Sequence, residues 1–190
     1  MSKKSKQTAV VISQEKLAEG IYDLWIETGL AKEAGAGQFI GVYPKNAATL
    51  LPRPISICEV NEERMALRLV YRVAGKGTTE FSSLKKDDRI EILGILGNGY
   101  RVPELLTGHP EFTEITLYGG GIGIPPMLQL SKELAAAGRK PSVFLGYRDS
   151  HLFLKEDFEK AGCKVIIATD DGSFGHHGLV TECLDGVAAD

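Results

Sequence analysis

Apolar and polar residues alternate along the first half of the chain in a pattern typical of strands. In the segment 20–27, Tyr22, Leu24 and Ile26 fall on one face of an extended chain, and the residues between them fall on the other. Further strands are expected at residues 9–12, 38–43, 55–60, 65–72 and 89–93. Short strands at this spacing predict a six-stranded antiparallel barrel. One helix is expected within it at residues 78–84, with Thr78 or Thr79 as its N-cap.

In the second half of the chain, expected strands alternate with expected helices. Strands are expected at residues 114–118, 142–147 and 164–169, and helices at 125–137, at 154–161 and from 178 to 184. This order predicts a parallel sheet with right-handed crossovers. Pro103, Gly108 and Pro110 punctuate the boundary between the halves. We therefore expect a barrel domain at residues 1–105 and an α/β domain, incomplete at its C-terminus, at residues 106–190.

Composition and charge exclude several classes of protein. Hydrophobic residues make up 43% of the 190 residues and charged residues 25%, as is usual for globular chains. The net charge of −3 gives no sign of a nucleic-acid-binding surface, and no apolar run is long enough to span a membrane. The basic segment 1–6 is not followed by an apolar stretch. We therefore expect a solvated, frayed start rather than a secretory signal.

Cysteine and histidine residues give no sign of a metal site. Cys58, Cys163 and Cys183 are too few and too far apart for a disulfide framework or a zinc site. Thiols of this kind are typical of a reducing cytoplasm, where we expect the protein to be located. His176 and His177 are adjacent, so we expect them to be solvated loop residues rather than a pair of metal ligands.

The first motif that could bind a ligand surrounds Arg53. A proline on each side of this residue fixes the chain in an extended form, from which the planar guanidinium can bind a phosphate. Ser56 would point to the opposite face of a strand, although a turn could bring it back towards Arg53. A proline-edged strand with a surface arginine is an equally open interpretation of this segment.

A second motif, the segment 74–78, places two glycines before a short helix. Glycines allow the backbone to approach a phosphate, and the start of a helix offers free N–H groups. The segment is not a Walker loop, because the spacing before Lys76 is wrong. Taken alone, a simple glycine-rich turn is the better interpretation.

A third motif, the segment 118–126, follows one expected strand and opens one expected helix. From Gly121 it runs G-x-G-x-x-P, which is close to a dinucleotide-binding loop with proline in place of the third glycine. Proline suits the first turn of a helix. The strand–loop–helix context makes this motif more specific than a glycine-rich loop alone.

The order of these three motifs resembles that of the ferredoxin-NADP reductase superfamily. Within the superfamily, the chain closely resembles the electron-transfer subunits of dihydroorotate dehydrogenase B over almost its whole length. The resemblance rests on the segments 51–57, 69–72, 75–78, 96–100, 119–128, 145–148 and 169–173. It implies a barrel that binds a flavin and an α/β domain that binds a nicotinamide dinucleotide.

The resemblance also implies which residues hold FAD. They come from two strands and a helix start: Arg53, Pro54, Ile55, Ser56, Val70, Tyr71, Arg72, Gly77 and Thr78. Arg53 would bind the pyrophosphate, and Ser56 would lie near the reactive edge of the flavin. Gly77 and Thr78 would hold the pyrophosphate where the helix begins.

For the electron donor NADH, the resemblance implies a floor made by Gly120, Gly121 and Gly123. The flavin supplies the chemistry, so we expect no catalytic acid, base or nucleophile. The choice between NADH and NADPH stays open at this stage. Asp149 would accept hydrogen bonds from an adenine ribose and disfavour a 2′-phosphate, whereas the neighbouring Arg148 favours one.

The chain departs from this family at its C-terminal side. Relatives of this type continue with a Cys-Gly-Pro turn and then four closely spaced cysteines that hold a [2Fe-2S] cluster, and neither occurs up to Asp190. We expect a truncated form rather than a natural variant, because three parallel strands alone would leave a sheet edge without its neighbour. A cluster is expected only in a full-length form.

The resemblance implies an electron-transfer flavoprotein of pyrimidine biosynthesis. Electrons from NADH would pass through FAD to the flavin-containing catalytic subunit of dihydroorotate dehydrogenase in a hetero-oligomer. No nucleic-acid or membrane partner is expected. Two alternatives remain at this stage, a stand-alone NAD(P)H-flavin reductase and a non-catalytic interaction subunit that keeps the fold.

Overall fold

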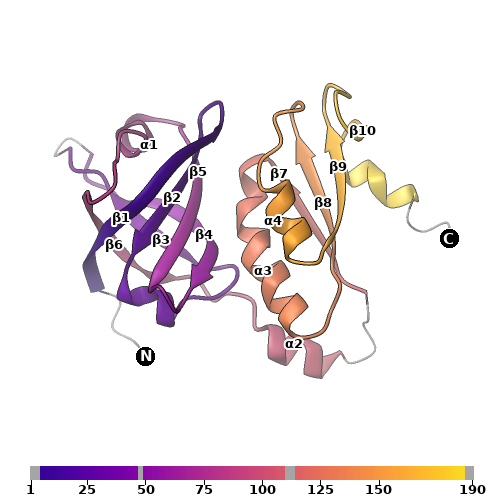
Figure 1. Ribbon diagram of the computed structural model, residues 1–190, viewed down its shortest axis with the longest axis horizontal. Helices are drawn as coiled ribbons and strands as arrows, with labels where there is room; N and C mark the ends of the chain where they lie inside the picture. Colours follow the sequence, from indigo (N-terminus) through magenta and orange to yellow (C-terminus); the bar gives the residue numbers. More distant parts are fainter. Residues whose placement is uncertain (1–4, 47–48, 110–113, 187–190) are drawn as a thin grey trace. The chain divides into compact units, whose positions relative to one another are not determined.

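The protein consists of two compact units in a computed structural model that describes residues 5–46, 49–109 and 114–186 (Figure 1). The units are Met1–Tyr100 and Arg101–Asp190. The division after Tyr100 lies close to the boundary after residue 105 that the sequence predicts.

The first unit is a closed antiparallel barrel. Its strands are β1 (Ser5–Ala18), β2 (Ile21–Glu27), β3 (Phe39–Tyr43), β4 (Arg53–Asn61), β5 (Ala66–Arg72) and β6 (Arg89–Leu96). They close in the order β1-β2-β5-β4-β3-β6, and every neighbouring pair is antiparallel. The six-stranded barrel expected from the alternating pattern is therefore confirmed.

The interior of the barrel is filled by every second residue of its strands. Leu24 and Ile26 of β2 and Leu67 and Leu69 of β5 are all at most 1% exposed and belong to one apolar cluster. Residues between them, such as Arg68, point to the outer face, because successive side chains of a strand alternate. This alternation decides which side chains can reach a ligand outside the barrel.

Strand β1 begins earlier than its apolar run indicates. Lys6 pairs with Leu93 of β6, its ammonium group forms an ion pair with Glu91, and it lies 4.5 Å from the centre of the Tyr43 ring. The expectation of a frayed start is therefore wrong for Lys6, while residues 1–4 lie outside the described residues. The cross-strand ladder orders this polar segment although it has few apolar residues.

Two short helices complete the first unit, η1 (Gly29–Lys32) and α1 (Lys76–Phe81). Phe81 is 2% exposed and packs edge-on against Tyr71, with 6.1 Å between the ring centres. The expected N-cap was wrong: Gly75 is the N-cap, and Thr78 lies inside the first turn. Helix α1 therefore begins earlier than the sequence predicts and ends at Phe81 rather than Leu84.

The second unit contains the expected parallel sheet. Strands β7 (Thr116–Gly120), β8 (Ser142–Tyr147), β9 (Lys164–Thr169) and β10 (His176–His177) lie in the order β10-β9-β8-β7, and all pairs are parallel. Helix α3 (Pro125–Ala136) joins β7 to β8, and α4 (Lys155–Lys160) joins β8 to β9. The β-α-β order is confirmed.

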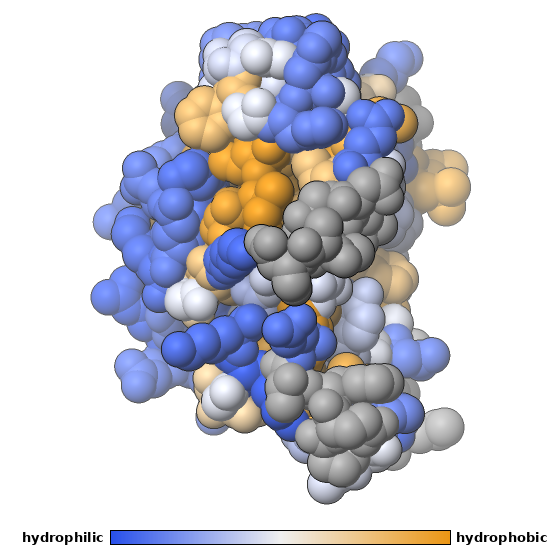
Figure 2. Space-filling view, turned by 90° about the vertical axis from the view of Figure 1, so that its right-hand side faces the viewer, coloured by the Kyte–Doolittle hydropathy of each residue, from blue (hydrophilic) through white to orange (hydrophobic). Residues whose placement is uncertain are grey.

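The two faces of this sheet are covered differently. A Cβ atom on Gly119 would lie 2.9 Å from Ile124, next to α3, whereas one on Gly146 would lie 3.1 Å from Val180 of η3 (Val180–Gly186). Helices α3 and α4 therefore cover one face, and η3 lies over the other (Figure 1). On the side of η3, hydrophobic residues gather in the upper middle of the surface, with hydrophilic residues above them and to their left (Figure 2).

Three elements of the second unit differ from the sequence-based expectation. Helix α2 (Val102–Gly108) forms where the sequence predicts only a punctuated boundary, and Pro103 occupies its first turn, where proline is tolerated. His176 and His177 form a two-residue strand rather than a loop, and both are exposed. The expected helix at 178–184 is the 3-10 helix η3. No helix in the described ranges is long and apolar enough to cross a membrane.

Candidate functional site

The guanidinium side of Arg53 lies against the start of α1. Arg53 is the first residue of β4 and is paired with the buried Val42 of β3. A Cβ atom on Gly77 would lie 2.8 Å from Nε of Arg53 and 3.1 Å from Cγ of Pro44. Only glycine therefore leaves room for Arg53 at this place. The structure thus brings together Arg53 and Gly77, two of the three residues that the resemblance assigns to a pyrophosphate, and the third is Thr78.

Thr78 shapes the turn that leads into α1. Its hydroxyl oxygen accepts hydrogen bonds from the N–H groups of Ala74 (2.8 Å) and Gly75 (3.1 Å), and the hydroxyl donates to the carbonyl oxygen of Gly75 (3.0 Å). This hydroxyl holds the loop, so it is the first amides of α1 that would bind an anion, since they have no carbonyl of a preceding turn. Arg53, Gly77 and these amides form a donor-rich cradle that fits a pyrophosphate.

The other residues of the first motif divide between two faces of β4. Ile55 packs against the barrel core, while Pro54 and Ser56 are exposed on the outer face. Ser56 therefore points away from the face of Arg53, as the strand alternation predicts. A ligand that contacts both Arg53 and Ser56 must therefore pass from one face of β4 to the other around the edge of the strand.

On β5, the expected flavin residues also alternate. Tyr71 is 2% exposed inside the barrel, its ring stacks on Tyr22 at 5.8 Å, and its hydroxyl donates to Oε1 of Gln14 at 2.9 Å. Burial raises the pKa of Tyr71 well above its ordinary value. Its side chain therefore serves the core, and Tyr71 has only its main chain to offer a ligand. Val70 and Arg72 lie on the outer face.

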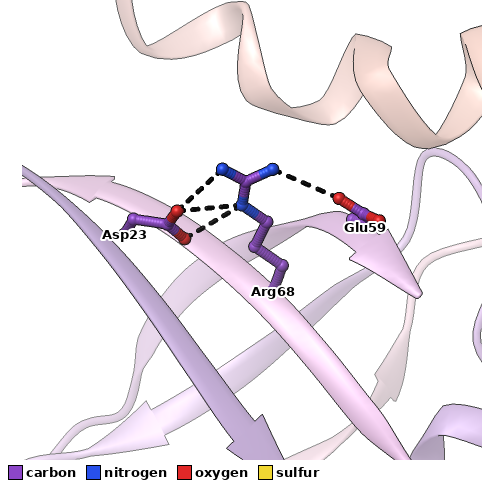
Figure 3. A network of polar contacts seen from close by, with 3 residues as sticks. All are labelled: Asp23, Glu59 and Arg68. Atoms are coloured by element: carbon purple, nitrogen blue, oxygen red, sulfur yellow. Dashed lines mark hydrogen bonds and ion pairs between the residues drawn. The ribbon is translucent and has the colours of Figure 1, made fainter. Parts of the chain in front are cut away.

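A buried ion network stands beside Val70 on this outer face, and sequence analysis missed it (Figure 3). Asp23 is paired with Val70 across β2 and β5. Arg68 donates from Nε to both carboxylate oxygens of Asp23 (3.0 Å each), from Nη2 to Asp23 Oδ2 (2.7 Å), and from Nη1 to Glu59 Oε2 (3.2 Å). The guanidinium thus joins three strands, and it does so where the β4–β5 register shifts between residues 57 and 59.

In the second unit, the glycines of the third motif have two different roles. A Cβ atom on Gly119 would collide with the backbone of Ile124, so this glycine is required for the strand to pack on α3. Around Gly120, Gly121 and Gly123, a Cβ atom would meet no heavy atom within 4 Å. These three expected residues therefore border open space at the end of β7, as a dinucleotide floor requires.

Two carboxylates follow the neighbouring strands β8 and β9. Asp149 Oδ1 accepts from the backbone N–H of His151 (2.9 Å) and lies 2.7 Å from its Nδ1. The hydrogen bonds from His151 lower the pKa of Asp149. Asp171 Oδ1 accepts from the N–H of Ser173 at 2.9 Å, and the hydrogen bonds from Ser173 lower the pKa of Asp171. Both groups are therefore anionic at neutral pH at the sheet edge beside the glycine loop.

The cysteines and histidines do not assemble into a metal centre within the residues that the structure describes. Cys58 is buried in β4, whereas Cys163 and Cys183 belong to the second unit and are free thiols. No three side chains of His, Cys, Asp or Glu approach one another as ligands of one ion in the described ranges.

Comparison with known proteins identifies the family. No protein-family model matches the chain. A dihydroorotate dehydrogenase B (NAD(+)) electron-transfer subunit from Enterococcus faecalis is 39% identical over 183 residues, which cover 95% of this chain and 68% of that protein. The Streptococcus mutans subunit is 33% identical over 180 residues, with the same coverage. The chain belongs to the family of dihydroorotate dehydrogenase B electron-transfer subunits. It spans 68% of the length of these two relatives.

Solved structures give the same fold for this family member. A structure of an NADH-dependent reduced ferredoxin-NADP oxidoreductase matches with a TM-score of 0.83 and 28% identity, over 96% of this chain and 63% of that one. A ferredoxin NADP⁺ reductase from Neisseria gonorrhoeae, solved with bound FAD and NADP, matches with a TM-score of 0.78 and 16% identity, over 95% and 76%. At 16% identity, the Neisseria gonorrhoeae structure is similar to this chain in its fold only. The family is one of oxidoreductase subunits that transfer electrons.

Proposed function

We propose that this chain binds FAD in its barrel and NADH at its glycine loop, and that it moves electrons between NADH and the catalytic subunit of dihydroorotate dehydrogenase B. The observation that supports the proposal most directly is the contact of Arg53 with Gly77 where α1 begins. This contact places a cation beside amides that can bind an anion. A hetero-oligomer with a flavin-containing partner, working in the cytoplasm in pyrimidine biosynthesis, completes the proposal.

FAD supplies the chemistry when bound, because a flavin accepts a hydride and releases electrons singly. The protein binds and orients it. Arg53 neutralises the pyrophosphate, and the glycine at position 77 lets the guanidinium lie close to the helix amides. The flavin extends along β4, where Pro54 and Ser56 contribute side chains and Ile55 its main chain, with Ser56 near the reactive edge. On β5, Val70 and Arg72 contribute side chains and Tyr71 its main chain.

The second unit brings the electron donor. Gly120, Gly121 and Gly123 leave the backbone of the loop accessible to a pyrophosphate and a nicotinamide. Anionic Asp149 and Asp171 favour a ribose hydroxyl and repel a 2′-phosphate, which supports NADH over NADPH. Arg148 is exposed and follows the same strand, so its substitution is the check on this preference.

Iron-sulfur chemistry is expected only in longer members of the family. A [2Fe-2S] cluster requires four thiolates, or two thiolates and two imidazoles. Cys58 lies in a different unit from Cys163 and Cys183. We therefore expect iron and acid-labile sulfide analysis of the 190-residue chain to give neither element in stoichiometric amount.

A visible spectrum of the purified chain, with and without NADH, tests the proposal. A yellow protein that NADH bleaches supports both sites, and a yellow protein that NADH leaves unchanged contradicts the dinucleotide site. A colourless protein that does not take up added FAD overturns the proposal. Adding the catalytic subunit of a relative then distinguishes electron transfer between subunits from a stand-alone flavin reductase, because only the former reduces the flavin of the partner.

Arg53→Ala tests the flavin site itself. Loss of a charge-assisted hydrogen bond to phosphate costs about 1.5–3 kcal/mol, which is roughly a 10- to 150-fold rise in the dissociation constant of FAD. A dissociation constant equal to that of the parent would show that Arg53 does not bind the pyrophosphate.

A further inference from the structure

The loop between β3 and β4 is tied to α1 at both of its ends. At its start, Pro44 lies against Gly77, with 3.1 Å between Cγ and an ideal Cβ position. At its end, Arg53 lies against the same glycine. We call the described residues of this loop, 44–46 and 49–52, the strap. Both ends of the strap thus lie at the proposed pyrophosphate site.

Glu80 fixes the first turn of the strap. Its carboxylate accepts hydrogen bonds from two successive backbone amides, with Oε1 on Lys45 N and Oε2 on Asn46 N, the latter at 3.2 Å. Consecutive N–H groups that converge on one anion form a nest, a geometry that binds anions. The backbone carbonyl oxygen of Asn46 in turn accepts a hydrogen bond from the N–H of Thr49 at 2.8 Å. A side chain of α1 therefore sets the backbone course of the strap.

The exposed end of the strap is apolar. Leu50 and Leu51 are 82% and 72% exposed, the two highest values among the large hydrophobic residues that the structure describes. The carbonyl oxygen of Leu51 accepts from Nη1 of Arg53 at 2.8 Å, so this apolar surface adjoins the guanidinium. A flat aromatic ligand next to a phosphate would remove this surface from water.

We propose that the strap holds the adenosine half of FAD and that Glu80 is its positioning residue. The proposal rests on the FAD site proposed above. There, the flavin half extends from Arg53 along β4 towards Ser56. The other half of the dinucleotide then leaves the pyrophosphate on the side of the strap, where Leu50 and Leu51 offer an apolar surface. Glu80 touches no part of FAD but sets the position of the residues that do.

The test compares FAD with its two fragments. FMN carries the flavin and one phosphate, and ADP carries the pyrophosphate and adenosine. For the full chain, dissociation constants of FAD and FMN are measured by flavin fluorescence, and that of ADP by competition. Glu80→Ala is expected to weaken FAD and ADP about tenfold or more and FMN less than twofold. The dissociation constant of either fragment is enough for the comparison, because the loss for ADP should match that for FAD and the loss for FMN should not.

Two further variants make the result specific. Glu63→Ala removes the same charge from the exposed β4–β5 turn and should leave all three constants unchanged. A Leu50→Ser/Leu51→Ser variant alters only exposed side chains and should show the same loss for FAD and ADP but not FMN, even if Glu80→Ala fails to fold. An equal loss for FAD and FMN, or no loss for FAD, would overturn the role of the strap while leaving the FAD site intact. A parent chain that binds no FAD would overturn both.

Discussion

Arg53 and Gly77 occupy adjoining space, so that a Cβ atom on Gly77 would lie 2.8 Å from the Arg53 Nε atom. Real Cβ atoms essentially never come this close to another heavy atom. The glycine at position 77 is thus not needed for an unusual backbone conformation. It is needed because a side chain from β4 occupies the place where its own side chain would be.

Gly77→Ala is therefore expected to displace Arg53 and to weaken FAD binding while the barrel remains folded. Since Arg53 is long and flexible, it can move aside, but it then no longer faces the helix amides. We expect the FAD dissociation constant to rise by about tenfold, equivalent to roughly 1.4 kcal/mol. Fluorescence titration measures it. Gly108→Ala, where a Cβ atom meets nothing within 4 Å, is the control, and equal affinity in both variants would refute the relationship.

The glycine loop of the second unit allows a similar separation of roles. Gly123→Val adds a side chain in open space at an ordinary backbone angle, so it should leave the fold and the FAD content unchanged. It should block the approach of the dinucleotide and slow flavin reduction by subsaturating NADH about tenfold or more.

Gly119→Ala is the matched contrast, because its Cβ would meet the Ile124 backbone at 2.9 Å. We expect it to destabilise the second unit, which thermal unfolding measures. Stopped-flow mixing with NADH decides the role of Gly123. A reduction rate equal to that of the parent would remove the loop from the dinucleotide site.

Much of the fold could be predicted from the sequence because strand periodicity carries it. The alternation around Leu24 and Ile26 gave the inner face of β2, and the strand–glycine–helix order gave the parallel sheet. Strand β1 was underestimated because its polar residues, such as Lys6, gain their order from pairing with β6. Helix α2 was missed because Pro103 resembles a breaker, although it stands in the first turn.

The candidate site could be predicted only as segments, not as contacts. Arg53 and Gly77 each stand in a recognisable motif, but their approach depends on how β4 meets α1. Glu80 and Arg68 belong to no motif. Their partners, the amides of Lys45 and Asn46 for one and the carboxylate of Asp23 for the other, are far away in the sequence. The only signal for Arg68 was a charged residue inside an apolar strand.

Tyr71 predicts how the stability of the first unit depends on alkaline pH. Burial raises its pKa, so the folded state favours the neutral phenol. The unfolded chain loses this proton near the ordinary tyrosine pKa of about 10, whereas the folded chain keeps it. The contribution of Tyr71 to stability is therefore complete below about pH 10 and declines as the pH rises further. Urea unfolding between neutral pH and pH 11 should show this decline, and Tyr71→Phe should make it shallower. An identical pH dependence in the variant would contradict the burial of this phenol.

The Asp23–Arg68–Glu59 network predicts a large loss of stability when its cation is removed. Arg68→Met leaves two carboxylates facing each other with no guanidinium between them, and both Asp23 and Arg68 are only 8% exposed. Removing one member of a buried ion pair costs about 3–5 kcal/mol, because the carboxylates stay desolvated and lose the guanidinium that compensated their charge. Urea unfolding of the parent and the variant measures the difference.

Arg68→Lys keeps the charge but cannot form the bidentate bond to Asp23, so its loss of stability should be intermediate. The triple variant Asp23→Asn, Glu59→Gln, Arg68→Met removes the excess charge and should recover most of the stability. If the single and triple variants were equally unstable, the cost would come from lost packing around Trp25, whose ring centre lies 5.7 Å from the guanidinium carbon, and not from the excess negative charge.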